Sequence, residues 1–465
     1  MNVWEVKETD ADTEAIAFGN LSLNGLKTSY QYDTLNNLIT VNQGVQTRSF
    51  AYNSLSRLKS ANNPESGLIN YKYDENGNLT NKKDARLIET NYVYDVLNRA
   101  TLRDYSDTMP DVTYTYDTAT VPFSKGKITK VSNTISETKY LGFDILGRVT
   151  GSQQKTDNVT YNPQSYVYNL SGALIEQVYP SGRVVKNTLD VDGDLAQVQS
   201  KKLNGTLQNY ANAFTYTSAG AVSSMRLGNG KFENTTFNSR LQPTQIGLGS
   251  SATSQNLLKL EFNYGGSDNN GNVKSQTITT PTVGNIAGFT ATQNYTYDSL
   301  NRIKQATEVV TGQPTQGWQQ TFVYDRYGNR TFDEANTTTL PKNCGTAPNK
   351  FICAIDIPKF NPSVNISDNK LVGTNYDNVG NTKVDANGQT FIYDAENKQV
   401  QVNNANGIVG QYFYDGDGKR IKKIVPLTNE TTIFVYDASG KMVAEYSTVS
   451  ASQSEAKTSV QSSMS

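Results

Sequence analysis

The sequence predicts an all-β protein built from tandem antiparallel β-hairpins, because one short phrase recurs along the chain at a nearly constant spacing. The phrase is an aromatic residue, any residue, a tyrosine and an aspartate, with glycine or asparagine three residues after the aspartate. Clear copies occupy residues 30–37, 71–78, 92–99 and 412–419. The Asp or Asn positions 33, 53, 74 and 95 are separated by 20, 21 and 21 residues. A repeat of about 21 residues holds two strands of ordinary length and two turns, so we expect one hairpin per repeat.

Each part of the phrase predicts a part of the hairpin. Aromatic residues two apart, such as Tyr92 and Tyr94, project from one face of an extended chain, while Val93 projects from the other. The following aspartate ends the strand, because its short side chain accepts hydrogen bonds from backbone N–H groups further along. Glycine and asparagine adopt positive φ at the least cost, so their position predicts a type I turn followed by a left-handed residue. A long polar residue such as Arg99 then starts the return strand.

These assignments define a set of structural turn residues, each of which has a role in closing a hairpin. They are Asp33, Asp74, Gly77, Asp95, Asn98, Asp144, Gly147, Asp298, Asn301, Asp325, Gly328, Asp377, Gly380, Asp394, Asp415, Gly418, Asp437 and Gly440.

The regularity of the period divides the chain into segments. The step from Asp325 to Asp377 is 52 residues long and predicts an insertion or a lost copy. The last residues are rich in Ser, Gln and Thr, which is typical of disorder. We expect an N-terminal entry segment (1–28), regular repeats (29–195), degenerate repeats (196–290), regular repeats with an insertion at about 331–370 (291–447) and a disordered tail (448–465).

The phrase Tyr/Phe-x-Tyr-Asp-x-x-Gly/Asn-Arg/Asn at this spacing resembles the YD repeat of the RHS family. That family includes bacterial Rhs proteins, the C component of insecticidal toxin complexes, wall-associated repeat proteins and animal teneurins. About a dozen copies across most of residues 29–447 carry the resemblance. It implies a β-hairpin ribbon that spirals into a hollow shell, which in bacterial relatives encloses a toxic C-terminal domain. It implies no enzyme activity for the shell itself.

Two features of the family pattern are missing. In relatives, the phrase at residues 432–446 runs into an Asp-His-Leu-Gly-Ser segment and later into an Asp-Pro-x-Gly core, where the toxin is cut loose. Neither motif occurs in this sequence. The self-cleavage and toxin activity of the family are therefore not carried over, and we expect this chain to be a piece of a longer protein.

Composition agrees with a wall one sheet thick. Hydrophobic residues make up 36% of the chain, there are 28 tyrosines, and the mean hydropathy is −0.56. Such a chain covers surface with amphipathic rings but does not fill a deep aliphatic core. About seventeen hairpins in one flat sheet would extend roughly 160 Å, and twisted sheets do not stay open at that width. We therefore expect a spiralling shell or an open curved ribbon.

Charge and hydropathy argue against two classes of partner. The chain has 42 Lys and Arg against 43 Asp and Glu, without a basic tract, which disfavours binding to nucleic-acid phosphates. The first twenty residues lack the basic and apolar regions of a secretory signal, and no stretch approaches the roughly 18 apolar residues of a membrane helix. We expect no nucleic-acid partner and no membrane insertion.

Few kinds of catalytic site are possible in this chain, because it contains no histidine. That removes Ser-His-Asp and Cys-His catalysis and histidine metal ligands. The carboxylates at Asp190, Asp192 and Asp194 alternate as in a calcium loop, but Lys201 stands where an EF-hand would need its bidentate Glu. A glycosidase carboxylate pair is disfavoured because the Asp of each repeat already has a turn role. We predict no catalytic residue, no cofactor and no metal site.

Two cysteines, Cys344 and Cys353, stand within the predicted insertion. Two thiols without another soft ligand do not form a structural zinc site. A disulfide in an oxidising compartment and a pair of free thiols both remain open.

The sequence thus predicts a non-enzymatic scaffold that encloses or presents a partner, with an effector or toxin polypeptide as the candidate. The alternative is a cell-surface adhesion or carbohydrate-binding repeat protein, since aromatic stripes interleaved with Asn, Gln and Ser can stack on a glycan. In either case we expect a secreted or cell-surface protein.

Overall fold

The computed structural model describes residues 2–6, 25–313, 317–340 and 360–448, and these residues form strands and turns almost throughout. Helical structure in these ranges is confined to Phe360 and the short 3₁₀ helix η1 (Pro426–Thr428). The predicted all-β class of tandem antiparallel hairpins is confirmed.

The strands are short and closely spaced. The first group is β1 (Asn2–Val6), β2 (Gly25–Tyr32), β3 (Leu38–Gln43), β4 (Gln46–Tyr52), β5 (Leu58–Asn63), β6 (Gly67–Tyr73), β7 (Leu79–Lys83), β8 (Glu89–Tyr94), β9 (Ala100–Tyr105), β10 (Val112–Tyr116), β11 (Ile128–Ser132), β12 (Ser136–Phe143), β13 (Val149–Thr156) and β14 (Val159–Thr160). The second group is β15 (Gln164–Tyr168), β16 (Leu174–Val178), β17 (Val184–Leu189), β18 (Leu195–Lys201), β19 (Gln208–Tyr216), β20 (Val222–Leu227), β21 (Phe232–Phe237), β22 (Pro243–Gly249), β23 (Leu258–Asn263), β24 (Ser275–Thr280), β25 (Phe289–Tyr297), β26 (Ile303–Val310), β27 (Trp318–Tyr324) and β28 (Arg330–Phe332). The third group is β29 (Val364–Asn365), β30 (Lys370–Leu371), β31 (Asn375–Tyr376), β32 (Thr382–Val384), β33 (Thr390–Tyr393), β34 (Gln399–Asn404), β35 (Gly407–Tyr414), β36 (Arg420–Val425), β37 (Glu430–Tyr436) and β38 (Met442–Thr448).

The strands form a ribbon in which neighbours in sequence are neighbours in space. Strands β1 to β28 belong to one antiparallel sheet, β29 pairs with β30, and β31 to β38 form a further sheet of 8 strands. Strand β14 is a side branch, because β13 pairs with both β14 and β15. A meander of this kind needs only short connections, which agrees with the short repeat.

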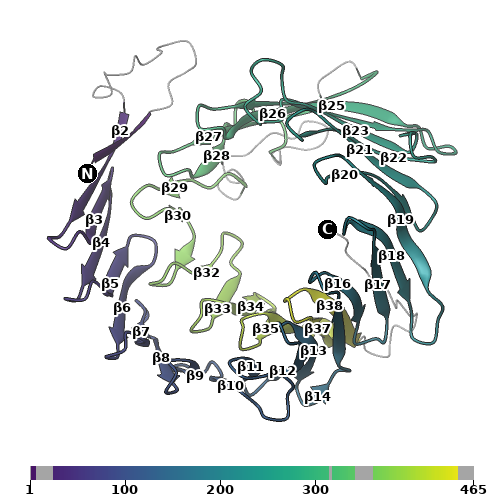
Figure 1. Ribbon diagram of the computed structural model, residues 1–465. Coiled ribbons are helices and arrows are strands. Elements are labelled where there is room, and N and C mark those ends of the chain that lie inside the picture. The colour runs from purple at the N-terminus through teal and green to yellow at the C-terminus, as the bar shows by residue number, and fades with distance from the viewer. Residues whose placement is uncertain (1, 7–24, 314–316, 341–359, 449–465) are drawn as a thin grey trace.

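The ribbon curves through a full circuit and then overlaps itself (Figure 1). Strands β2 to β28, the first coil, run round a ring, and strands β29 to β38, the second coil, continue inside that ring alongside β4 to β16. Hydrogen bonds between the coils join residues 260 to 323 positions apart. The predicted spiral is therefore present, and it closes on itself through side-chain contacts.

The ribbon has two different edges. The repeated Asp-x-x-Gly/Asn turns lie along one edge, called here the turn edge, and the connections between repeats lie along the other, the connecting edge. Strand β6 illustrates the arrangement, because the turn at 74–77 joins it to β7 and the connection at 84–87 joins β7 to β8. Along the first coil the connecting edge includes residues 44–45, 63–66, 84–87, 106–111, 133–135, 157–163 and 179–182.

The wall is one sheet thick, so few side chains are deeply buried. In β6, Leu68, Asn70 and Lys72 are exposed, whereas Ile69, Tyr71 and Tyr73 on the opposite face are half-buried. A small buried cluster of Tyr105, Val112, Val131 and Ala395 lies where the two coils meet.

The predicted segment boundaries remain predictions, but three observations bear on them. The entry segment 1–28 contains β1 and the start of β2, which pair with each other through Asn2 and Ser29. The meander continues through 196–290, and residues 217–220 form a regular turn there. Residues 341–359 of the predicted insertion, with Cys344 and Cys353, and nearly all of the tail lie outside the described residues.

The turn at 74–77 offers a test of the backbone geometry. Gly77 has a φ of 90°, so Gly77→Val forces a β-branched residue into a strained conformation, and we expect a loss of about 1–3 kcal/mol in the free energy of unfolding. Glu75→Val places the same side chain in the same turn at an exposed position without positive φ, and we expect less than about 0.5 kcal/mol. Urea unfolding of both variants measures the difference, and equal losses would show that the left-handed residue is assigned wrongly.

Candidate functional site

The repeat turn is the local unit from which the wall is built. In the turn after β8, the Asn98 amide donates to the Asp95 carbonyl at 3.0 Å, and Asn98 has a φ of 59°. One carboxylate oxygen of Asp95 accepts the amides of Leu97 and Arg99, each at 2.9 Å. The other oxygen accepts Nε of Arg99 at 2.7 Å. One aspartate therefore closes the turn and orients Arg99, the residue just before the return strand β9.

The structure places all the sequence-predicted turn residues in this geometry. The Gly and Asn members have φ between 59° and 90°. The aspartate carboxylates accept the amide four residues on at 2.7–2.9 Å; these residues are Asp33, Asp74, Asp95, Asp144, Asp298, Asp325, Asp377, Asp394, Asp415 and Asp437. The members up to Asp325 and Gly328 lie on the turn edge of the first coil, and those from Asp377 on lie in the second coil.

In eight hairpins a tyrosine hydroxyl joins the hairpin to the one before it. The second tyrosine of the repeat, Tyr94, donates its hydroxyl to the carbonyl of Leu79, the first residue of the preceding return strand, at 2.9 Å. The same bond recurs from Tyr116, Tyr216, Tyr264, Tyr297, Tyr324, Tyr414 and Tyr436, with lengths of 2.6–3.1 Å. This bond, called here the tyrosine latch, gives the tyrosine a role in these eight hairpins, whereas Phe143 and Leu189 occupy the same position in two others.

At Tyr116 and Tyr324 an arginine of the preceding hairpin also stacks on the latch tyrosine. The guanidinium of Arg99 lies over the ring of Tyr116, which belongs to the next hairpin, with its carbon 4.3 Å from the ring centroid. Arg57, Arg148 and Arg302 stack in the same way on Tyr73, Tyr168 and Tyr324. Stacking and the latch both act between neighbouring hairpins, so they stiffen the ribbon along its length.

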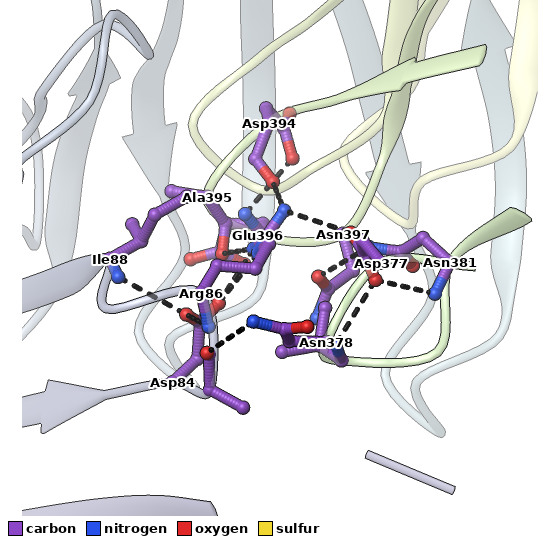
Figure 2. Close-up of polar contacts among 12 residues, drawn as sticks. Asp84, Arg86, Ile88, Asp377, Asn378, Asn381, Asp394, Ala395, Glu396 and Asn397 are labelled. Carbon is purple, nitrogen blue, oxygen red and sulfur yellow. Dashed lines mark hydrogen bonds and ion pairs between the residues drawn. The ribbon is translucent and has the colours of Figure 1, made fainter. Parts of the chain in front are cut away.

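The second coil rests with its turn edge on the connecting edge of the first coil. Figure 2 shows Arg86 of the first coil reaching to the turn at Asp394. Its guanidinium donates to the carbonyls of Asp394 at 3.0 Å and Ala395 at 3.3 Å, while Asp84 binds it from its own turn at 2.7 Å. Side chains of Arg86 and Asp84 are mostly buried. Because turn carbonyls are the acceptors, the contact uses groups that every repeat turn presents.

The next hairpin repeats this contact with tighter packing. Arg103 donates to the carbonyl of Gly416 at 2.6 Å, and Tyr105 donates its hydroxyl to Glu396 at 2.7 Å. A Cβ atom on Gly416 would stand 2.6 Å from methyl carbons of both Val112 and Val131. The contact therefore requires a residue without a side chain at this turn tip.

Amide side chains complete the contact further along. Gln154 is buried and both accepts the amide of Tyr436 at 3.1 Å and donates to the carbonyl of Phe434 at 2.9 Å. Gln164 donates to the carbonyl of Tyr436 at 2.8 Å, and the amide of Ala438 donates to the hydroxyl of Tyr166 at 2.9 Å. The coils are thus bonded through backbone groups along the whole arc that they share.

The pKa values of turn aspartates are shifted in different directions in the two coils. In the first coil, hydrogen bonds from the Asn78 side chain and the Arg99 amide are the main causes that lower the pKa of Asp74 and Asp95. In the second coil, burial against the first raises the pKa of Asp394 and Asp415. Asp74 and Asp95 on the one hand and Asp394 and Asp415 on the other therefore respond to acid in opposite directions.

The arrangement is suited to holding a wall together. Each predicted turn carboxylate is engaged by the amides of its own turn, including Asp190, which accepts from Asp192 and Asp194 at 3.0 and 2.9 Å. In the part of the chain that the structure describes, no group of three or more acidic or cysteine side chains is placed to hold a metal ion. Within the same ranges, no helix has the length and apolar content needed to cross a membrane.

Sequence reasoning missed the residues that join the coils, among them Arg86, Arg103, Gln154 and Gln164. Arg86 stands in a turn whose left-handed residue is Leu87, with a φ of 71°, so the Gly/Asn signal is absent. The others are polar strand residues without a distinguishing pattern, and their partners lie 280 or more positions away in the cases of Gln154 and Arg103.

Comparison with solved structures places this fold among toxin-complex chains. A Photorhabdus luminescens Tc holotoxin pore matches with a TM-score of 0.73 and 15% identity over 92% of this chain. The TcdB2-TccC3 crystal structure matches with a TM-score of 0.74 and 16% identity over 92%, and the TcdB2-TccC3-Cdc42 structure with 0.72 and 17% over 90%. This chain spans about a quarter of those chains, 23% to 24% of their length. No family model and no curated protein matches the sequence. The predicted YD-shell fold is therefore confirmed as a fold.

The tyrosine latch makes a direct prediction. Tyr94→Phe removes the hydroxyl that binds Leu79 and leaves that carbonyl without its donor, so we expect a loss of about 1 kcal/mol in unfolding free energy. Tyr32→Phe is the control, because Tyr32 is 42% exposed, and we expect a smaller change. Thermal and urea unfolding measure both variants. If Tyr94→Phe is as stable as Tyr32→Phe, the tyrosine latch does not stabilise the fold.

A second prediction concerns acid. Asp95 has a lower pKa folded than unfolded, so its stabilising effect is complete above the unfolded value, about 4, and is lost as the pH falls through the folded value. Asp415 has a raised folded pKa, so its charge opposes folding at neutral pH and this effect disappears as the pH falls. At pH 7 we expect Asp415→Asn to leave the free energy of unfolding unchanged or to raise it, and Asp95→Asn to lower it. Both changes relative to the wild type should become smaller at about pH 3. Urea unfolding at the two pH values measures these changes. A change in unfolding free energy of the same sign for both variants at pH 7 would contradict the prediction.

Proposed function

We propose that this chain is a non-enzymatic segment of a β-shell that encloses a polypeptide partner. The observation that carries the proposal is the contact between the coils, because a ribbon that completes a circuit and bonds to itself forms a closed wall. The similarity to toxin-complex chains supports the same function, with an effector or toxin polypeptide as the enclosed partner and a site of action outside the producing cell.

The contact between the coils is also what makes the proposal testable. Arg86→Met with Arg103→Met removes the guanidinium groups that donate to the carbonyls of Asp394, Ala395 and Gly416. Each charged hydrogen bond contributes about 1.5–3 kcal/mol, so the second coil should separate from the first at least about tenfold more often. Lys72→Met, an exposed change on β6, is the matched control.

The measurement is protection of the partner against protease in the assembly isolated from the cells that make it. We expect the enclosed polypeptide to survive in the wild-type and control assemblies and to be digested at least about tenfold faster in the double variant. An assembly without an enclosed polypeptide, or one digested at the same rate in all three forms, contradicts enclosure.

A screen of the purified chain against glycan arrays and generic glycosidase, protease and nuclease substrates distinguishes the carbohydrate-binding alternative from the enclosing function. We expect neither binding nor turnover. Specific glycan binding without turnover would favour the adhesive function, and turnover abolished by one Asp or Glu substitution that preserves the fold would overturn the non-enzymatic proposal.

A further inference from the structure

Glycine and asparagine both occur at the left-handed position of the turns along the turn edge, and both tolerate positive φ there. Asn98 and Asn301 have φ of 59° and 60°, and Gly147 and Gly418 each have a φ of 78°. The conformation of the turn itself therefore does not decide between the two residue types. The choice follows the preceding hairpin, through the residue directly after its own left-handed residue, called here the flanking residue.

An asparagine as the flanking residue is followed by asparagine at the left-handed position of the next turn in four pairs. In each pair the side-chain amide of the first asparagine donates to the side-chain carbonyl of the second at 2.8–2.9 Å. The pairs are Asn78 with Asn98, Asn272 with Asn301, Asn329 with Asn369 and Asn381 with Asn397. A glycine in the second position would offer no acceptor for this amide.

A cation as the flanking residue is followed by glycine in seven pairs. These are Arg57 with Gly77, Lys127 with Gly147, Arg148 with Gly172, Arg302 with Gly328, Lys370 with Gly380, Lys398 with Gly418 and Lys419 with Gly440. A Cβ added to Gly147 or Gly418 would stand 2.5 Å from the ammonium nitrogen of Lys127 or Lys398. The end of the cation thus occupies the space that a side chain on the next turn would need.

The arginines gain a further contact in this position. Arg57 donates to the carbonyl of Asp74 at 2.8 Å, and a Cβ on Gly77 would stand 3.9 Å from the same guanidinium. Arg148 donates to the carbonyl of Asn169 at 3.4 Å, and a Cβ on Gly172 would stand 3.2 Å from it. The cation therefore binds the backbone of the next turn, whereas asparagine binds its side chain.

One asparagine and one cation depart from the pattern. Asn37 is followed by Ser56 at the left-handed position, and Arg99 forms an ion pair with Asp117 of a longer turn. Between residues 173 and 242 the flanking residues are of other types, namely Ala173, Asp194, Ala221 and Gln242. The pairs therefore lie on both sides of a stretch that overlaps the predicted degenerate repeats.

An array of similar hairpins has a problem of specificity. Its return strands can pair with the first strand of a wrong hairpin, either elsewhere in the chain or in another copy. The flanking residue distinguishes such neighbours, because asparagine beside glycine lacks its acceptor and a cation beside asparagine loses its space. A difference of this kind between right and wrong neighbours is what specificity requires.

We propose that the flanking residue selects the hairpin that lies beside it, with asparagine selecting an asparagine turn and a cation selecting a glycine turn. The pair is a recognition element between hairpins, in addition to the backbone ladder that all hairpins share. This selection determines the order of hairpins in the wall and does not depend on whether the wall encloses a partner.

Two reciprocal double-mutant cycles in the full chain test the proposal. The first makes a cation–glycine pair with Asn78→Lys and Asn98→Gly, and the second makes an asparagine pair with Lys398→Asn and Gly418→Asn. Hydrogen exchange at the turns 95–98 and 415–418 measures the local opening equilibrium of each variant. We expect each double variant to open at least about threefold less often than the product of its two single effects.

The matched control combines Asn78→Lys with Asn301→Gly, which changes the same residue types in hairpins that are not neighbours. We expect its two effects on the opening of the turn 95–98 to multiply within about twofold. Single effects that also multiply in either neighbouring cycle would overturn the proposal, because a residue with a purely local role acts independently of the next turn. Coupling of equal size in the control would overturn it as well, since selection requires adjacent hairpins.

Discussion

The structure depends on contacts between neighbouring hairpins, because a wall one sheet thick has no second layer against which to bury a face. Backbone hydrogen bonds hold the strands together but leave the ribbon free to twist and bend. At Tyr116 and Tyr324 the tyrosine latch and the arginine stack act on the same ring, and both the carbonyl and the guanidinium belong to the preceding hairpin. These contacts fix one repeat to the next. Since each latch tyrosine and each stacking arginine contacts two hairpins, the array gains stiffness without a deep core.

The contact between the coils extends the same chemistry to a second direction. In a repeat turn the aspartate accepts the backbone amides, so the backbone carbonyls remain available to other donors. Arg86, Arg103 and Gln164 of the first coil donate to such carbonyls of the second coil. Small tips at Ala395 and Gly416 allow close approach to the connecting edge. A large tip also reaches that edge where it makes a hydrogen bond, because the hydroxyl of Tyr327 donates to the carbonyl of Gln43 at 2.8 Å.

The turns were predictable from the sequence because their chemistry is local. Asp95 and Asn98 are three residues apart, and side-chain length and tolerance of positive φ settle what they do. The spiral followed from the number of repeats and from sheet twist. The partner of Arg86 was not predictable, because it lies 308 residues away and depends on how many hairpins complete a circuit. Curvature is a sum of small rotations over the whole ribbon, and no short pattern encodes that sum.

The most direct test of this account compares two turns of the same type that differ in docking. The amide of Ala438 donates to Tyr166 across the coil contact, whereas Ile145, at the equivalent position of its turn, stands on the free edge. Hydrogen exchange of the full chain, resolved at the turns 437–440 and 144–147, measures both amides under one condition. The account predicts that the Ala438 amide exchanges at least about tenfold more slowly than the Ile145 amide. Equal exchange rates at the two turns would show that the second coil does not rest on the first, and would contradict a closed wall.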